Sequence, residues 1–403
     1  MQQSPPRGRR GVRSLALTAA VGLALAGCSA AGQNKSGSST TAVEDAKNSG
    51  PSAIVVDTGS GETPVPVSQK ITVKAEGGSL TSVEVSSPGH GTVAGSLSPD
   101  KSIWTSSSPL APGAEYTVTA QGAGNDGAKL TKTASFTTQA AANTFVGTYN
   151  VNKGSTVGVA MPVSITFNKP IQDKAAVERK LAVTASPAVD GSWSWMKDRD
   201  GKDRVDYRPK EYWKPGTDVT LRMDLAGVDA GGGLYGTQQR EVNFRIGDAV
   251  TSTVDVEKKT MTVAKNGKVL RTLNVSTGKK DFETWNGTMV VLSKVPSIRM
   301  NSATVGIFGP EAYDMEDVKW DVQLTPSGTY AHAAPWNEGK FGRVNASHGC
   351  IGMSTEDAKW FFDQVNPGDP VTVVNSVDTV AVNNGYGDWN VDWATWQKGS
   401  ALS

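Results

Sequence analysis

Cysteine and histidine are scarce in this chain of 403 residues, which has two cysteines, Cys28 and Cys350, and three histidines. No C-x-x-C pair occurs. Two of the histidines lie near Cys350, but the fourth ligand of the usual zinc patterns is missing. We therefore expect neither a metal site nor another cofactor.

The chain also has no excess of either charge, with 40 basic and 39 acidic residues. This balance excludes the basic field of a nucleic-acid-binding protein, and no nucleic-acid partner is expected. Long helical periodicities are few, whereas Gly, Ser, Thr and Val are abundant. This composition favours a mainly β protein, and the length allows two to four domains.

An apolar run long enough to cross a bilayer is missing at the N-terminus. The apolar stretch from Leu15 to Leu25 has about eleven residues, fewer than the ~20 that a spanning helix needs. It follows several arginines, as in a signal peptide. The stretch ends in Leu25-Ala26-Gly27-Cys28, which resembles a bacterial lipobox.

This resemblance implies a lipoprotein signal peptide over residues 1–27 and a diacylglycerol group on the Cys28 thiol. The alternative is an ordinary signal peptide beside an incidental cysteine. With the lipid, we expect the protein to be anchored to the outer face of the cytoplasmic membrane, facing the cell wall. Cys350 would then be an unpaired thiol in an exported protein, either an intermolecular link or a reactive group.

Residues 28–50 are rich in small and polar residues and are predicted to be a flexible tether. Short alternating strands separated by turns follow, and Pro109–Tyr116 is echoed by Tyr212–Val219. We predict two tandem immunoglobulin-like β-sandwiches, over residues 51–139 and 140–248. A spacer role is favoured for both modules, with glycan binding as the alternative.

Residues 249–375 are predicted to form a β-rich domain with one principal helix, from Ser354 to Val365. Asn266-Gly267 lies between two strand-like runs and predicts a hairpin. A Trp-rich extension, residues 376–403, ends the chain. Because exposed indoles are costly, we expect its tryptophans to pack on the preceding domain and the second module; carbohydrate stacking is the alternative.

His332 and His348 both lie within eighteen residues of Cys350, so the thiol and its candidate bases share a neighbourhood. A thiol attacks as its thiolate and needs a base to remove its proton. If the segment is extended, His348 and Cys350 share one face, and His332 arrives on a neighbouring strand. The amides around Gly349 and Cys350 would stabilise an oxyanion. These parts suit acyl transfer through a thioester; the alternative is a buried, inert cysteine.

The run Ser347-His348-Gly349-Cys350, preceded by His332, resembles the signature of the L,D-transpeptidases (the YkuD-type domain). The resemblance covers about residues 250–375, including Ser276–Lys279 and Thr284–Thr288. The layout is similar to that of the actinobacterial lipoprotein members, with a lipobox, a tether, two immunoglobulin-like modules, a catalytic domain and a Trp-rich tail.

The resemblance implies that Cys350 is the nucleophile, that His332 is the general base and that His348 shapes the site. The resemblance also implies a lid at about residues 300–320 and a set of substrate-binding and oxyanion residues beneath it. These residues are Gly349, Ser347, Ser327, Gly328, Tyr313, Gly352 and Trp336. It also implies peptidoglycan stem peptides as partners: a tetrapeptide donor that loses D-Ala and a diaminopimelate-type acceptor, joined in a 3→3 cross-link. Carbapenems are the expected covalent inhibitors.

Two positions depart from the family pattern. Gly352 stands where members often have Asn or Arg, and Ala333 where they often have Ser. Acceptor choice and the ratio of transfer to hydrolysis therefore stay open, and an L,D-carboxypeptidase is an alternative. A catalytically silent cell-wall-binding lipoprotein is another. A sortase would need an Arg after Cys350, and a papain-like enzyme would place its Cys before its His; neither pattern occurs.

Overall fold

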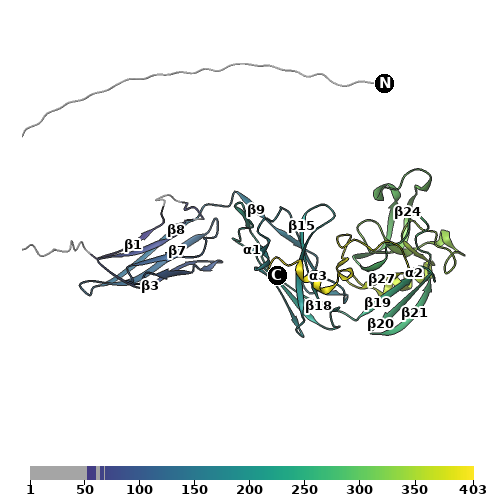
Figure 1. Cartoon of the computed structure of the whole chain (residues 1–403), viewed down its shortest axis with the longest axis horizontal. Helices are drawn as coiled ribbons and strands as arrows, with labels where there is room; N and C mark the ends of the chain where they lie inside the picture. Colours follow the sequence, from purple (N-terminus) through teal and green to yellow (C-terminus); the bar gives the residue numbers. More distant parts are fainter. Residues whose placement is uncertain (1–51, 60–63, 68) are drawn as a thin grey trace, which may run out of the picture. The chain divides into compact units, whose positions relative to one another are not determined.

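The computed structural model describes residues 52–59, 64–67 and 69–403, most of which belong to or connect short β-strands (Figure 1). The predicted signal peptide, Cys28 and the tether lie outside the described residues. Within these ranges, no helix combines the length and the apolar character that crossing a membrane requires.

Two four-stranded sheets form the first sandwich. One sheet has the order β1-β2-β6-β5 and the other β4-β3-β7-β8. Along β7 every second residue is buried, so Tyr116, Val118 and Ala120 point into the core between the sheets. The strands are β1 (Ala53–Asp57), β2 (Thr72–Glu76), β3 (Gly78–Ser87), β4 (Gly91–Thr92), β5 (Gly95–Leu97), β6 (Ile103–Ser106), β7 (Glu115–Gly124) and β8 (Lys129–Thr137).

The second sandwich also has two four-stranded sheets, with the orders β10-β12-β15-β14 and β11-β18-β16-β13. Its core contains Phe167, Trp213 and Leu221. Its elements are β9 (Asn143–Phe145), β10 (Gly147–Tyr149), β11 (Thr156–Val157), β12 (Val163–Phe167), α1 (Lys174–Glu178), β13 (Leu181–Ser186), β14 (Gly191–Lys197), β15 (Asp203–Pro209), β16 (Asp218–Asp224), β17 (Leu234–Gly236) and β18 (Gln239–Ile246). The prediction of two tandem β-sandwiches is confirmed.

The following domain has a five-stranded sheet, β21-β20-β19-β27-β22, and a four-stranded sheet, β23-β24-β25-β26. The strands are β19 (Val250–Asp255), β20 (Thr260–Lys265), β21 (Lys268–Asn274), β22 (Gly287–Val290), β23 (Ser293–Asn301), β24 (Asp314–Gln323), β25 (Tyr330–Ala333), β26 (Ile351–Met353) and β27 (Pro370–Val374). The principal helix, α2 (Thr355–Gln364), directly follows β26 and packs against β24 and β25.

Local sequence signals explain two of these elements. Asn266 and Gly267 have φ values of 50° and 79° and join β20 to β21, which confirms the predicted hairpin. The Ser354 side chain accepts a hydrogen bond from the Asp357 amide (3.1 Å) and so caps α2. Ala358 and Phe361 form the buried face of the helix.

The C-terminal extension contains η4 (Asp388–Asn390) and α3 (Trp393–Lys398), and in Figure 1 the yellow α3 lies beside the second sandwich. The Trp396 indole donates a hydrogen bond to Ser192 O (3.0 Å), and that of Trp389 to Ala160 O (2.9 Å). Asn390 bonds to the amide of Thr288 in β22 (2.7 Å). The tryptophans thus pack on the second sandwich, as predicted, whereas the contact with the following domain shown here is made by Asn390 and not by a tryptophan.

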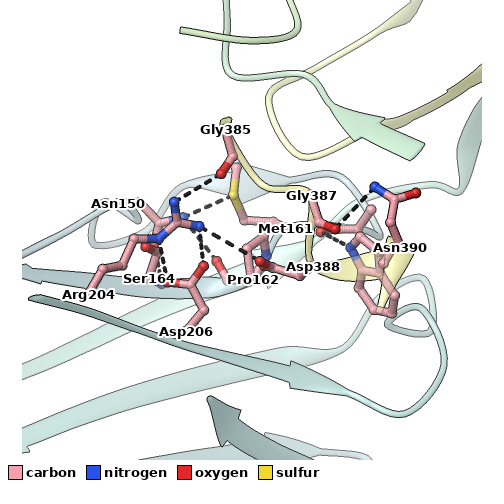
Figure 2. Close-up of polar contacts among 12 residues, drawn as sticks. Asn150, Met161, Pro162, Ser164, Arg204, Asp206, Gly385, Gly387, Asp388 and Asn390 are labelled. Carbon is pink, nitrogen blue, oxygen red and sulfur yellow. Dashed lines mark hydrogen bonds and ion pairs between the residues drawn. The ribbon is translucent and has the colours of Figure 1, made fainter. Parts of the chain in front are cut away.

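Two arginines of β15 hold this extension. The Arg208 guanidinium lies 4.8–5.3 Å from the ring centres of Trp389, Trp393 and Trp396. Figure 2 shows Arg204 paired with Asp206, bonded to Gly385 O (2.9 Å) and 3.8 Å from Asp388. Burial, and then the Asp206 charge, raise the pKa of Asp388 well above its usual range. We infer that Asp388 is protonated, so that one arginine balances one carboxylate.

Candidate active site

Cys350 and His332 come together because two parallel strands carry them. In the β25–β26 pair, Ala331 lies opposite Ile351 and His332 opposite Gly352. Cys350 immediately precedes β26, and His332 lies in β25, the neighbouring strand that the sequence required. Both side chains line a cavity of about 240 Å³, called here the nucleophile cavity.

Burial keeps both groups uncharged at rest. Cys350 is 7% exposed and burial raises the pKa of its thiol to about 11, although the Tyr330 amide opposes this by a hydrogen bond. Burial lowers the pKa of His332 to about 4. At neutral pH the pair is therefore a thiol beside a neutral imidazole.

The tautomer of His332 follows from its one hydrogen bond. Its Nδ1 lies 2.8 Å from Ala333 O, and because a carbonyl oxygen only accepts, Nδ1 carries the hydrogen. Nε2 then has a lone pair and is the basic atom. No direct hydrogen bond joins Cys350 to His332 in the described part of the chain; the thiol instead donates to Gly328 O at 3.5 Å. Such separations are common before substrate binds.

The segment before Cys350 is bent, so the expected extended conformation is wrong. Gly349 has a φ of 111°, a value that favours glycine, and this bend directs both His348 and Cys350 to the nucleophile cavity. Ser347 Oγ donates to Cys350 O (2.6 Å) and accepts from the Gly349 amide (3.2 Å). Thr284 Oγ1 donates to Gly349 O (2.9 Å). The Gly349 amide is thus already engaged, and its oxyanion role stays a prediction.

His348 is held by partners that the sequence did not indicate. Its Nε2 lies 2.7 Å from Glu311 Oε2, and the same oxygen accepts a hydrogen bond from Lys279 Nζ (2.5 Å). The imidazole also packs near two aromatic rings, with 4.8 Å to the ring centre of Phe282 and 5.3 Å to that of Tyr313. Glu311 is 37 residues from His348 in the chain, so no local pattern joins them.

The predicted lid is smaller than expected. Strands β23 and β24 extend into it, and only residues 302–313, the lid tip, connect them through η1 (Ser302–Val305) and η2 (Gly309–Glu311). Ser302 Oγ closes the tip: it donates to Ile307 O (2.9 Å) and accepts from the Tyr313 amide (3.0 Å).

A second cavity of about 470 Å³, called here the channel cavity, adjoins the nucleophile cavity, and Tyr313 and His348 line both. The predicted channel residues Ser327 and Gly328 line it, as does Gly349. Ser327 Oγ accepts a hydrogen bond from Asn384 of the C-terminal extension (2.8 Å), and Asn384 accepts one from Arg199 of the second sandwich (3.1 Å).

The remaining predicted residues, Ser347, Trp336 and Gly352, line the nucleophile cavity. Trp336, in η3 (Pro335–Asn337), is half exposed and stacks on His332 with 5.8 Å between ring centres. Gly352 exchanges two backbone hydrogen bonds with Ser276 (2.8 Å each). A Cβ at Gly352 would lie 3.0 Å from the Ala334 Cβ, so a larger residue would need a small shift there.

Within the described ranges, no three or more His, Cys, Asp or Glu side chains are grouped so as to hold a metal ion.

Comparison with known proteins gives two family matches. Residues 249–373 match the L,D-transpeptidase catalytic domain, and residues 62–229 match a bacterial Ig domain. L,D-transpeptidase 2 of Mycobacterium tuberculosis (strain CDC 1551 / Oshkosh) is 37% identical over 344 residues, which are 85% of this chain and 83% of the relative. L,D-transpeptidase 5 of the same species (strain ATCC 25618 / H37Rv) is 35% identical, over 82% of this chain and 73% of the relative.

Among solved structures, that of LD transpeptidase LdtMt1 in complex with imipenem is 35% identical to this chain. It matches 56% of this chain and 97% of its own, with a TM-score of 0.49.

Proposed function

Because this chain belongs to the L,D-transpeptidase family, we propose that it cross-links peptidoglycan through a thioester on Cys350. The observation that carries the proposal is the shared cavity of Cys350 and His332, with Nδ1 of His332 engaged by a carbonyl and Nε2 left as the base. Two neutral groups at rest suit general-base removal of the thiol proton during attack.

The first half of the reaction releases D-Ala. As Cys350 Sγ attacks the carbonyl carbon between the third stem residue and D-Ala, His332 Nε2 takes the thiol proton. The tetrahedral intermediate collapses, its C–N bond breaks, and the proton passes from His332 to the leaving amine. The backbone amide of Tyr330, which lowers the pKa of the Cys350 thiol, would stabilise negative charge on the sulfur. The product is a thioester of the tripeptide stem.

The second half forms the cross-link. The side-chain amine of an acceptor stem attacks the thioester carbonyl and gives a proton to His332; the sulfur leaves and takes that proton back as a thiol. A 3→3 link results. The nucleophile and channel cavities, which share Tyr313 and His348 in their lining, would provide separate room for the donor and the acceptor.

The same nucleophile would open the β-lactam ring of a carbapenem and keep it as a thioester. A relative that is 35% identical was solved in complex with imipenem, which supports this class of inhibitor for the present chain.

We also propose that a lipid on Cys28 anchors the protein to the outer face of the cytoplasmic membrane, facing the cell wall. The lipobox-like Leu25-Ala26-Gly27-Cys28 supports this location. The test is membrane fractionation of cells that express the wild type or Cys28→Ser. Release of the variant from membranes supports the anchor, and unchanged fractionation contradicts it.

Product analysis tests the catalytic proposal. Wild type and Cys350→Ala are incubated with a disaccharide-tetrapeptide, and the products are identified by mass spectrometry. Release of D-Ala with a 3→3 dimer, absent from Cys350→Ala, supports a transpeptidase. A tripeptide without dimer would identify an L,D-carboxypeptidase, and no product would favour a silent wall-binding protein.

A further inference from the structure

A single carboxylate on the lid tip contacts a lysine and a histidine of the domain below it. Glu311, at the end of η2, accepts hydrogen bonds on Oε2 from Lys279 (2.5 Å) and from His348 (2.7 Å). Lys279 follows β21. His348 belongs to the loop that precedes β26 and carries Cys350, called here the nucleophile loop. Glu311 therefore joins the lid to the nucleophile loop directly. Hydrogen bonds from Lys279 and then His348 lower the pKa of Glu311, which keeps it charged.

Few other side chains hold the lid tip down. Phe308, its largest apolar residue, is 69% exposed, and Val305 is 40% exposed although it packs beside Gly328. The bonds of Ser302 lie within the tip and fix its shape rather than its position. The Glu311 contacts are thus the main polar attachment between the tip and the nucleophile loop.

The wall between the two cavities depends on the same contacts. Tyr313 and His348 line both cavities and lie 5.3 Å apart between ring centres, and Glu311 is two residues before Tyr313. A bond from Glu311 to His348 fixes both halves of this wall, one from the lid and one from the nucleophile loop.

We propose that Glu311 is a positioning residue: through His348 and Lys279 it holds the lid tip over Cys350 and keeps the wall between the nucleophile and channel cavities closed. Lifting the lid breaks these contacts and opens the thiol to solvent and to the channel cavity. The consequence for product choice rests on the proposed function. If the lid opens and exposes the Cys350 thioester to water before the acceptor binds, hydrolysis competes better with attack by the acceptor amine.

Alkylation of Cys350 tests the positioning role without any need for transpeptidase activity. The full chain is treated with iodoacetamide, and peptide mass spectrometry follows Cys350 separately from Cys28. The matched control is Glu316→Gln, which removes an exposed acid of β24, on the same hairpin. Partly exposed ion pairs contribute modestly, so Glu311→Gln should raise the alkylation rate roughly three- to tenfold, with Glu316→Gln at the wild-type rate.

Two further measurements separate positioning from general loosening. The Lys279→Met change should also raise the alkylation rate of Cys350. The double variant, Lys279→Met with Glu311→Gln, should be alkylated no faster than Glu311→Gln alone, because both changes remove the same Lys279–Glu311 contact. Added salt should speed the wild type but not Glu311→Gln. Equal alkylation rates for Glu311→Gln and Glu316→Gln would overturn the proposal, as would a lower melting temperature of Glu311→Gln that accounts for its faster alkylation.

With a disaccharide-tetrapeptide, Glu311→Gln should shift products from dimer toward hydrolysed tripeptide. An unchanged product ratio beside faster alkylation would overturn the role in product choice. If the wild type gives no product at all, the proposed function fails while the alkylation result still decides the positioning role.

Discussion

His332 lies opposite Gly352 in a parallel strand pair, and this register brings its imidazole to the cavity that holds the Cys350 thiol. Neither group is charged at rest, since burial raises the pKa of one and lowers that of the other. The site therefore differs from one in which a preformed thiolate waits beside an imidazolium.

The first prediction concerns the pH dependence of the free thiol. Because burial raises the pKa of Cys350 to about 11, the thiolate fraction should rise about tenfold per pH unit up to at least pH 10. The rate of iodoacetamide alkylation at Cys350, measured from pH 6 to 10, checks this. A plateau below pH 8 would indicate a preformed ion pair instead.

The second prediction concerns the base. Glutamine at position 332 keeps a polar side chain but cannot take the thiol proton, so His332→Gln should slow acylation by about 10²- to 10⁴-fold. The rate of acyl-enzyme formation with a carbapenem measures the effect. His90→Gln, a turn residue of the first sandwich, is the control and should acylate at the wild-type rate.

The third prediction concerns Asp321 of β24, which is fully buried with both carboxylate oxygens unpartnered in the described structure. Burial raises its pKa from 3.8 to about 7. The folded state therefore holds this proton more tightly than the unfolded state. Ionising Asp321 therefore lowers the free energy of unfolding. This loss of stability is absent below pH 4, grows from pH 4 to 7 and is complete above pH 7.

Asp321→Asn removes this ionisation. The free energy of unfolding of the variant relative to wild type should rise by a few kcal/mol, ~4 at most, between pH 4 and 7. Chemical denaturation at several pH values measures the difference, with the exposed Asp378→Asn as control. A difference that does not change with pH would contradict the assignment.

The fourth prediction concerns the C-terminal extension. Arg208 lies among three indoles and donates a hydrogen bond to Val391 O (2.7 Å). Arg208→Leu should weaken docking of residues 376–403 by about 2–4 kcal/mol, since desolvated cation–π contacts are worth more than exposed ones. Limited proteolysis of the extension reports the loss. Arg222→Leu, which breaks the exposed ion pair between Arg222 of β16 and Glu241 of β18, should leave the cleavage rate unchanged.

Sequence reasoning succeeded where the signal is local. Asn266-Gly267 predicts its hairpin because both residues tolerate positive φ, and Ser354 predicts the start of α2 because its hydroxyl caps the first turn. The motif around Cys350 likewise predicted that His332 reaches Cys350 from a neighbouring strand, and β25 does bring His332 to the cavity that Cys350 lines.

It failed where the answer depends on contacts between distant segments. Glu311 contacts His348 only because the β23–β24 hairpin folds over the nucleophile loop. No sequence pattern near either residue predicts this contact. The hydrogen bond from Arg199 to Asn384 likewise joins segments 185 positions apart, because the C-terminal extension packs on the second sandwich. The bend at Gly349 was missed because a histidine two residues before a cysteine fits either a strand or a turn.

The most direct test of the central claim is the mass of the covalent intermediate. The protein is mixed with a disaccharide-tetrapeptide, quenched in acid within the first turnover and mapped by peptide mass spectrometry. We predict one adduct, on Cys350, with the mass of the donor minus D-Ala, absent from Cys350→Ala and much reduced in His332→Gln. An adduct that keeps D-Ala, an adduct on another residue, or turnover by Cys350→Ala would contradict the thioester mechanism.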